Sequence, residues 1–401
     1  MILRSTDGQP DLPRYFAQVF RIASGLKHGR LDFVLADGRR FRAEGKAAGP
    51  LAEIHVVDDD IFARLIREGD LGFSEAYLEG GWTTPDLQAF MDMIHADNDS
   101  VYDGFPGMGV LRAYERLRHL LRSNSRGQAR RNIAYHYDLG NAFYALWLDR
   151  SMTYSSALFR SGQESLEAAQ RAKYASMVDR MGVGPGDHVL EIGCGWGGFA
   201  EYAAGERGLR VTGLTISQAQ LDFARARIAR AGLGDRVDLR LQDYRDERGA
   251  YDGIASIEMF EAVGEAYWPA YFAQVRDRLV SGGRAALQII TIDEEIFPRY
   301  RRELDFIRRY IFPGGMLPTR TILEKLGAGH DLALVAQRAF GRDYALTLAQ
   351  WRDRFRAAWP DIMQQGFDER FRRLWEYYLS YCEAGFRSGA IDVRHIIFAR
   401  R

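Results

Sequence analysis

The chain contains the stretch His188-Val-Leu-Glu-Ile-Gly-Cys-Gly-Trp-Gly-Gly198, in which an apolar strand reaches an acidic residue and then breaks into glycines. Glycines at 193, 195 and 197 leave backbone N–H groups and the start of a helix open to a ligand, because no side chain there blocks its approach. The stretch therefore predicts a nucleotide-binding turn between a strand and a helix.

Strands and helices alternate through this part of the chain. Strands are expected to end at residues 192, 214 and 241 and to cover 253–257, 284–292 and 393–399, with helices from about 197, from a cap at Ser217 and around 268–279. This alternation predicts an α/β fold with a doubly wound parallel sheet.

The glycine spacing also fits the dinucleotide pattern G-x-G-x-x-G, so the ends of the neighbouring strands must identify the nucleotide. A dinucleotide site needs an acidic residue at the end of the second strand, where this chain has Thr215-Ile-Ser-Gln218. The third strand ends in Gln242-Asp243-Tyr244, where S-adenosylmethionine (SAM) methyltransferases commonly place an adenine-contacting acid. Glu191 stands where such folds keep a carboxylate facing the cofactor. These strand ends favour SAM, and a nicotinamide oxidoreductase is the alternative.

Composition limits the other classes of function. The formal net charge is zero, so no overall field favours nucleic acid. Cys194 and Cys382 are too few for a disulfide framework and show no metal-ligand spacing, so no metal site is expected and a reducing cytoplasm fits. No signal core and no apolar run of membrane-spanning length are present, so we expect any contact with lipid to be made from outside the bilayer.

Three parts are expected along the chain: an α+β unit over residues 1–100, a basic linker over 101–131, and a catalytic domain over 132–401 with a substrate-covering insertion near 293–341. Residues 112–131 carry seven arginines and one acid, with apolar residues at roughly helical spacing. Such a helix can lie on an anionic membrane surface, and a solvated linker helix is an equal alternative.

Nine segments together match a known family. They are Leu71-Gly-Phe-Ser-Glu-Ala-Tyr-Leu-Glu-Gly-Gly-Trp82, His136-Tyr-Asp-Leu-Gly-Asn141, Met152-Thr-Tyr-Ser155, Glu191-Ile-Gly-Cys-Gly-Trp-Gly-Gly198, Thr215-Ile-Ser217, Leu241-Gln-Asp-Tyr-Arg-Asp246, Met259-Phe-Glu261, Tyr310-Ile-Phe-Pro313 and Asp343-Tyr344. With these segments the chain resembles the cyclopropane-fatty-acyl-phospholipid synthase family over nearly its whole length.

The resemblance implies an enzyme that adds a one-carbon unit from SAM across the cis double bond of an unsaturated phospholipid acyl chain. It also implies a class I SAM-methyltransferase fold, with a seven-stranded sheet preceded by a smaller lipid-handling domain. A homodimer and a peripheral location at the cytoplasmic face of the cell membrane are further expectations from the resemblance.

The reaction needs a dry and aromatic site, because alkene attack on the sulfonium methyl creates a carbocation that water would quench. A dense aromatic cluster precedes the sheet: Tyr135, Tyr137, Phe143, Tyr144, Trp147, Tyr154 and Phe159. We expect about half of these rings to be ordinary core residues.

The cofactor-binding residues are expected on the strand ends and on the segment before the sheet. Tyr154 and Ser155 are assigned by the resemblance alone, and Cys194 is read as a small spacer in the glycine loop. The expected set is Tyr154, Ser155, Glu191, Gly193, Cys194, Gly195, Gly197, Thr215, Ser217, Gln218, Gln220, Gln242 and Asp243.

A base must remove a proton after methyl transfer. In the family a bicarbonate serves, held by a Glu, a Tyr, a His and the backbone of two further residues. The resemblance places Glu261, Tyr344 and the backbones of Ser156 and Ile292 in these roles. Cys382 matches a family active-site cysteine, although the mechanism needs no thiolate and a structural role is favoured.

The family histidine is replaced by Ile290 in this chain. Ile290 offers no side-chain donor, so an anion loses a charge-assisted contact worth about 1.5–3 kcal/mol. Bicarbonate is therefore left open, and so is the product. Either another base, such as Glu261 itself, closes the ring, or loss of a different proton gives a methyl- or methylene-branched chain with help from a separate reductase or desaturase. A non-catalytic lipid-binding relative is a third possibility.

Overall fold

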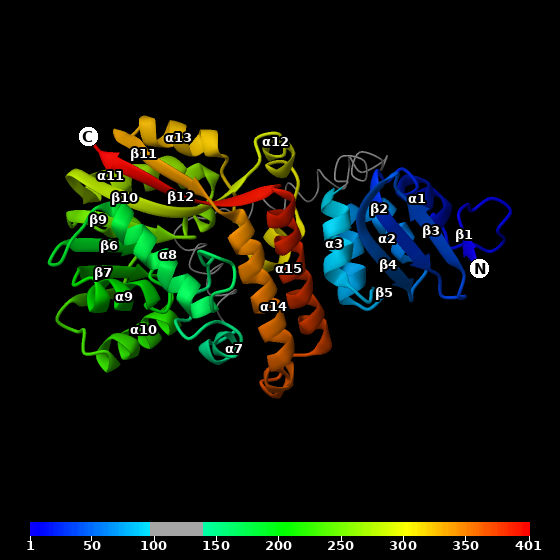
Figure 1. The fold of residues 1–401 in the computed structure, drawn as a ribbon, viewed down its shortest axis with the longest axis horizontal. Coiled ribbons are helices and arrows are strands. Elements are labelled where there is room, and N and C mark those ends of the chain that lie inside the picture. The colour runs from blue at the N-terminus through cyan, green and yellow to red at the C-terminus, as the bar shows by residue number, and fades with distance from the viewer. Residues whose placement is uncertain (97–138) are drawn as a thin grey trace.

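The computed structural model describes residues 1–96 and 139–401. The expected basic helix over 112–131, the rest of the linker, and Tyr135, His136 and Tyr137 lie outside the described residues. A small N-terminal unit and a larger sheet domain stand on either side of two long helices, α14 and α15 (Figure 1). No helix in the described ranges is both long and apolar enough to cross a bilayer.

The larger domain is built on a seven-stranded sheet with strand order β11-β12-β10-β9-β6-β7-β8. Its strands are β6 (His188–Ile192), β7 (Arg210–Thr215), β8 (Val237–Leu241), β9 (Tyr251–Ile257), β10 (Leu279–Ile292), β11 (Leu332–Ala339) and β12 (Ile391–Arg400). All pairings are parallel except those of β12, which runs antiparallel to β10 and to β11. The predicted α/β class and seven-stranded sheet are confirmed, with one antiparallel strand added.

Helices cover both faces of this sheet because its apolar strands must be buried on each side. They are α8 (Leu166–Met181), α9 (Gly198–Glu206), α10 (Gln218–Arg230), α11 (Trp268–Arg278) and α13 (Arg320–Ala328). One core holds Met177, Phe199 and Leu221, and the opposite core holds Phe272 and Leu323. The predicted cap is confirmed, since Ser217 Oγ accepts a hydrogen bond from the Gln220 N–H at 3.3 Å.

The N-terminal unit packs helices against a five-stranded sheet of order β1-β3-β2-β4-β5. Its elements are β1 (Ile2–Leu3), α1 (Phe16–Ala23), β2 (His28–Val34), β3 (Arg40–Glu44), β4 (Ala47–Val56), α2 (Ile61–Leu78), β5 (Trp82–Thr83) and α3 (Leu87–Ala96). Helix α2 breaks at Gly69, whose φ is 66°, and then resumes.

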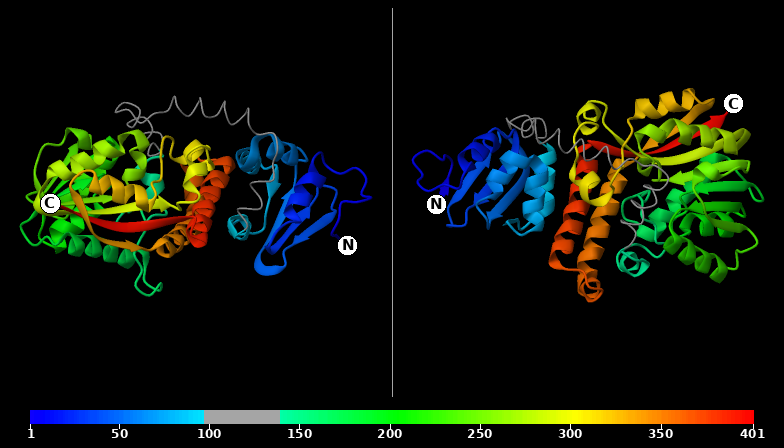
Figure 2. Two further views of the ribbon diagram at one scale, coloured as in Figure 1. Left: turned by 90° about the horizontal axis from the view of Figure 1, so that it is seen from above. Right: turned by 180° about the vertical axis from the view of Figure 1, so that it is seen from behind.

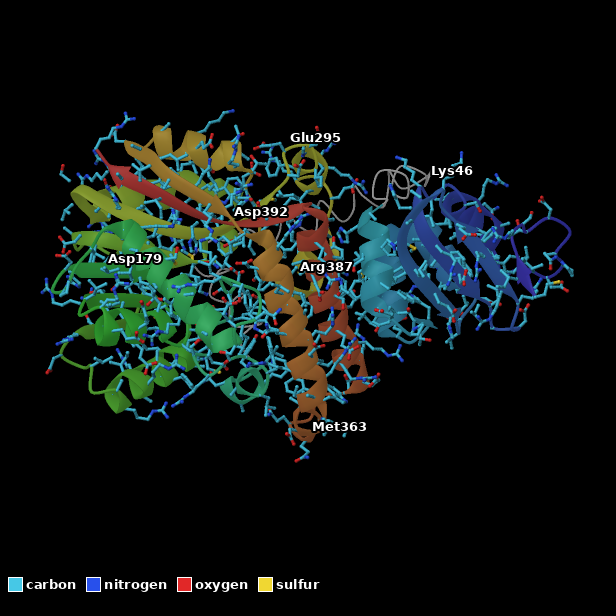
Figure 3. All side chains as sticks on the ribbon, viewed as in Figure 1. Lys46, Asp179, Glu295, Met363, Arg387 and Asp392 are labelled. Carbon is cyan, nitrogen blue, oxygen red and sulfur yellow. The ribbon has the colours of Figure 1, made fainter. Side chains whose placement is uncertain are left out.

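Helices α14 (Gly341–Gln364) and α15 (Glu369–Ser388) join the two units. On α15, Arg387 faces α3 (Figure 3) and pairs with Asp92 at 2.8 Å. Arg352 of α14 contacts both Glu383 of α15 and Gln88 of α3, and all three residues are buried. The N-terminal unit is therefore fixed to the sheet domain by α15.

The segment after β10 differs from the single insertion expected over 293–341. It contains α12 (Phe297–Tyr300) and one π-helical turn, η4 (Ile307–Ile311), before α13 and β11 return the chain to the sheet. Of the expected insertion over 293–341, only residues 293–319 lie outside the layers of the sheet domain, because α13 and β11 belong to them. Both views in Figure 2 place this stretch beside α15, and Phe306 contacts Tyr377 with ring centroids 4.5 Å apart.

Candidate active site

A cavity of about 830 Å³ opens where the parallel strands of the larger sheet end. It is lined by the residues that follow β6, β7, β8 and β9, by Ile290 and Ile292 of β10, and by the stretch 296–317. Asp70 of α2 and His95 of α3 also line it, so both units enclose the same space. The carboxyl edge of an open α/β sheet is where ligands bind in this architecture.

The glycine loop forms one wall of the cavity. The N–H groups of Gly193 and Cys194 both donate to the Leu214 carbonyl, at 3.0 and 2.8 Å, which fixes the loop against β7. Gly195 has φ 50°, and a Cβ built there would have no atom within 4 Å. The loop therefore presents bare backbone to a ligand at Gly195.

Glu191 lies at the end of β6 and faces the cavity. Burial raises the pKa of this carboxyl to about 8, and the nearby Lys173 opposes the rise. Its Oε2 atom is buried and has no hydrogen-bond partner among the described residues. A ligand with a cationic donor would satisfy this oxygen, so Glu191 and the open loop at Gly195 fit SAM.

The structure divides the expected cofactor residues into two groups. Those that line the cavity are Tyr154, Ser155, Glu191, Gly193, Cys194, Gly195, Thr215, Gln220, Gln242 and Asp243. Gly197, Ser217 and Gln218 do not line it. Gly197 packs on Ala224, Ser217 caps α10, and Gln218 is exposed and bonds Asp222 at 2.7 Å.

Glu261 follows β9 in a short 3-10 turn and also faces the cavity. Its Oε1 accepts a hydrogen bond from the Ile290 N–H at 2.5 Å, while Oε2 is buried and has no partner among the described residues. Burial, and then the charge of Glu258, raises the pKa of Glu261 to about 8. The Ile290 backbone thus holds Glu261, although its side chain offers nothing to an anion.

Glu258 is a functional candidate that was not expected from the sequence. Tyr344, which was expected to join Glu261 around bicarbonate, donates instead to Glu258 Oε2 at 2.6 Å. The Ser156 N–H and the Gln288 amide both donate to Oε1 of Glu258, at 2.8 and 2.7 Å. The only sequence signal was its place directly after a strand, at the same sheet edge as Glu261.

The expected bicarbonate set is not assembled as the resemblance implied. The Ile292 N–H donates to the Pro318 carbonyl at 3.0 Å, and the Ser156 N–H donates to Glu258. Both backbone donors are therefore occupied by protein acceptors. The sequence could not reveal this, because both acceptors lie far along the chain from these donors.

Cys382 lines the cavity from α15 as a partly buried free thiol. Burial raises its pKa well above the usual range, so the thiolate is disfavoured. This argues against the catalytic role that the resemblance suggested for Cys382. Among the described residues, no group of three His, Cys, Asp or Glu side chains is placed to hold a metal ion.

The aromatic residues before the sheet serve two purposes. Phe143, Tyr144 and Trp147 are fully buried in the core, as expected for about half of the cluster, and Phe159 is buried as well. Tyr154 lines the cavity and its hydroxyl hydrogen-bonds that of Tyr378 at 2.8 Å. π faces therefore border the cavity close to the glycine loop.

Known proteins resemble this chain over most of its length. The family model for mycolic acid cyclopropane synthetase matches residues 124–396. The chain is 40% identical over 382 residues to the tuberculostearic acid methyltransferase UfaA1 of Mycobacterium tuberculosis, covering 91% of this chain and 87% of that protein. It is 35% identical over 355 residues to the cyclopropane-fatty-acyl-phospholipid synthase of Escherichia coli K12, covering 87% and 88%.

Solved structures agree with these relatives. The crystal structure of the mycolic acid cyclopropane synthase CmaA1, complexed with SAH and CTAB, superposes with a TM-score of 0.64 at 29% identity. The match covers 68% of this chain and 98% of that one. Together with the SAM-compatible loop at the sheet edge, these matches leave no support for a nicotinamide oxidoreductase. The chain belongs to the mycolic acid cyclopropane synthetase family and is a SAM-dependent methyltransferase.

Proposed function

We propose that this enzyme adds a one-carbon unit to the cis double bond of an unsaturated phospholipid acyl chain, as a cyclopropane fatty acid synthase does. The observation that carries the proposal is the cavity itself. It joins the glycine loop to a mainly apolar chamber in which the carboxyl groups of the half-buried Glu258 and Glu261 face the same space. An alkene is apolar and its methylation requires both exclusion of water and later removal of a proton.

The residues that line the cavity suit methyl transfer followed by removal of a proton. SAM supplies an electrophilic methyl group, and we propose that Glu191, the glycine loop, Tyr154, Ser155, Thr215, Gln220, Gln242 and Asp243 hold it. Apolar side chains such as Ile257, Leu348 and Phe386 line the adjoining space and keep water from a cation formed on the acyl chain. The Tyr154 and Tyr378 rings stabilise positive charge through their π faces.

A methyl- or methylene-branched product is the second candidate. Two observations favour it: Ile290 replaces the family histidine, and the relative at 40% identity is named as a tuberculostearic acid methyltransferase. A branched alkene would need a separate reductase to become a saturated methyl branch. We also propose a peripheral position at the cytoplasmic face of the membrane and a homodimer, both from the family resemblance.

Methyl transfer to vesicles tests the proposal. Purified protein is incubated with methyl-labelled SAM and vesicles of unsaturated phospholipid, and the acyl chains are analysed by mass spectrometry. We expect a gain of one labelled carbon in unsaturated chains, with saturated phospholipid as the control. Ozonolysis then separates the products, because a branched alkene is cleaved and a cyclopropane is not. Absence of label from the acyl chains, with SAM bound, would leave the non-catalytic lipid-binding interpretation.

A further inference from the structure

Glu258 has a backbone conformation that a glutamate rarely adopts. Its φ is 50°, in the left-handed region, at the residue directly after β9. Such a conformation costs about 1–2 kcal/mol for a side chain with a Cβ, and strain of this kind concentrates at functional sites. The strained backbone directs the Glu258 side chain into the cavity beside Glu261.

The carboxylate of Glu258 is held by three donors with defined directions. Oε1 accepts from the Ser156 N–H and the Gln288 amide, and Oε2 accepts from the Tyr344 hydroxyl. The Gln288 amide is itself oriented, because its oxygen is paired with His395 Nε2 at 2.9 Å, which turns its NH₂ group toward Glu258. Burial raises the pKa of Glu258, and these three donors oppose the rise by stabilising the charged form.

Two of these donors, Ser156 and Tyr344, are those expected to hold a bicarbonate. A carboxylate and a bicarbonate both present two oxygens in a plane with one negative charge, so the same donors suit either. The buried Lys173 supplies positive charge nearby, since its charge interaction with Glu258 opposes the effect of burial on both groups. The Glu258 carboxylate would repel a bound bicarbonate at this place. A histidine that holds bicarbonate is then not needed, which accounts for its replacement by Ile290.

We propose that Glu258 is the base of this enzyme and takes the place of a bound bicarbonate. This inference rests on the proposed function. As the C–C bond forms and the methyl–sulfur bond breaks, positive charge appears on the acyl chain. For ring closure, a C–H bond of the added methyl group gives its proton to Glu258, and the electron pair of that bond joins the methyl carbon to the cationic carbon. For a branched alkene, a C–H bond adjacent to the cationic carbon gives the proton, and its electron pair forms a double bond. In both cases Glu258 later returns the proton to solvent.

Glu261 has a different part in this arrangement. Its pKa of about 8 keeps it protonated at neutral pH when Glu258 is ionised, so the two carboxyls share one charge. We infer that Glu261 is a positioning residue whose neutral side chain borders the substrate and is fixed by the Ile290 N–H. This differs from the expectation that Glu261 itself holds or acts as the base.

The native enzyme gives the first test, by the vesicle assay in buffer purged of carbon dioxide. We expect turnover to change by less than twofold when bicarbonate is removed or restored. A loss of tenfold or more that bicarbonate reverses would overturn the inference while leaving the proposed function intact. If label never enters the acyl chains, the proposed function fails instead, whatever the bicarbonate level.

Two variants give the second test. Glu258→Gly suits the positive φ, so the variant is expected to fold, and it leaves a space bounded by the Ser156, Tyr344 and Gln288 donors. Turnover should fall at least about 100-fold, the usual contribution of a general base. Added formate or bicarbonate should raise the turnover of Glu258→Gly at least tenfold, since either anion can enter that space.

Glu258→Gln keeps the size of the side chain but cannot accept the proton, so the same loss should occur and added anions should not reverse it. SAM binding by calorimetry serves as the folding check for both variants. If Glu258→Gln retains more than a tenth of native turnover, Glu258 is not the base. A Glu261→Gln variant should lose less than tenfold, and a larger loss there than at Glu258 would transfer the role to Glu261.

Discussion

At the scale of single residues, the site is a set of carboxyl groups arranged around one buried lysine. Lys173 is fully buried and donates to Ser155 Oγ at 2.6 Å. Burial lowers its pKa to about 7, while the charges of Glu258, Asp149 and Glu191 act in the opposite direction. The ionisation of each group therefore depends on its neighbours, and a cationic ligand will shift it.

Binding of SAM should depend on pH through Glu191. With a pKa of about 8, this carboxyl is protonated in the free protein at lower pH, and it must lose that proton to accept a cationic donor. We therefore expect SAM affinity to fall as pH drops below about 8, by up to about tenfold per pH unit. Titration calorimetry across this range checks it.

The matched variant is Glu191→Gln, which removes the titrating group and keeps the shape of the side chain. It should bind more weakly, and its affinity should follow only the ligand's own ionisation. If the SAM affinities of the native protein and of Glu191→Gln change with pH in parallel, ionisation of Glu191 is not the cause of the pH dependence.

Residue-level prediction from sequence agrees with the cavity lining where chemistry and strand ends coincide, and cofactor binding by these residues stays a prediction. Glu191, Gly193, Gly195 and Asp243 were placed by the strands that carry them, and all four line the cavity. Glu258 was not among the expected site residues, because nothing local in the sequence distinguishes it from a strand residue. Its φ of 50° and its bonds to Ser156 and Tyr344 arise from tertiary structure, which spacing along the chain does not encode.

At the scale of elements, the glycine loop combines two kinds of constraint. A Cβ at Gly195 would enter open space on the ligand side, whereas a Cβ at Gly197 would lie 3.0 Å from the Ala224 Cβ on α10. Both positions have positive φ, so alanine at either costs about 1 kcal/mol in backbone strain. The two positions differ in what the added methyl group contacts, which is the ligand side of the cavity at 195 and Ala224 of α10 at 197.

Alanine substitutions at these two glycines should therefore separate binding from stability. Gly195→Ala should weaken SAM binding at least about tenfold while changing the free energy of unfolding by only about 1 kcal/mol. Gly197→Ala should lower that free energy by about 2–3 kcal/mol, because α10 must shift. Calorimetry and urea unfolding measure the two quantities. Equal losses of affinity and stability in both variants would contradict the division.

Most strands and helices of the sheet domain were predictable because their residues are apolar in continuous runs. The stretch after β10 was not, since β11 is an edge strand whose residues beyond Leu332 are mainly exposed. Its first five residues, Leu332 to Ala336, are apolar, but they fall inside the stretch expected to be one insertion, so the strand was not separated from it. Its pairing with β12 depends on partners nearly seventy residues later, since Leu332 pairs with Arg400 and Ala333 with Ala399.

At the scale of the whole molecule, the attachment of the N-terminal unit depends on a buried ion pair. Glu383 is fully buried between Arg352 and Arg387, and Arg352 also reaches Gln88 of α3. Removing Arg352 leaves the buried Glu383 with the half-exposed Arg387 as its remaining partner, and such a loss inside the protein is more costly than losing an exposed pair.

Arg352→Met should therefore lower the free energy of unfolding by about 3–5 kcal/mol. The control is Arg372→Met, which breaks an exposed pair with Glu369 and should cost about 0–1 kcal/mol. Urea unfolding followed by tryptophan fluorescence compares them. The double variant Arg352→Met with Glu383→Leu should recover most of the loss, because it removes both charges. A double variant as unstable as Arg352→Met would argue for a packing effect.

Attraction to membranes stays a prediction from the basic stretch over 112–131, which lies outside the described residues. If those arginines contact anionic lipid, vesicle binding should weaken steeply as salt rises, since screening shortens the range of the attraction. Sedimentation with anionic vesicles at increasing ionic strength checks this, with zwitterionic vesicles as the control. Binding that is insensitive to salt would favour the solvated-linker alternative.

The enclosure of the cavity by both units has a consequence for product purity. In the proposed reaction, a water molecule that reaches the cation before the base does would add to it and give a methyl-branched alcohol. Disturbing the packing of α2 or α3 over the cavity should therefore appear as hydroxylated acyl chains beside the normal product. The proportion of alcohol in the lipid would then measure how well the N-terminal unit seals the reaction chamber.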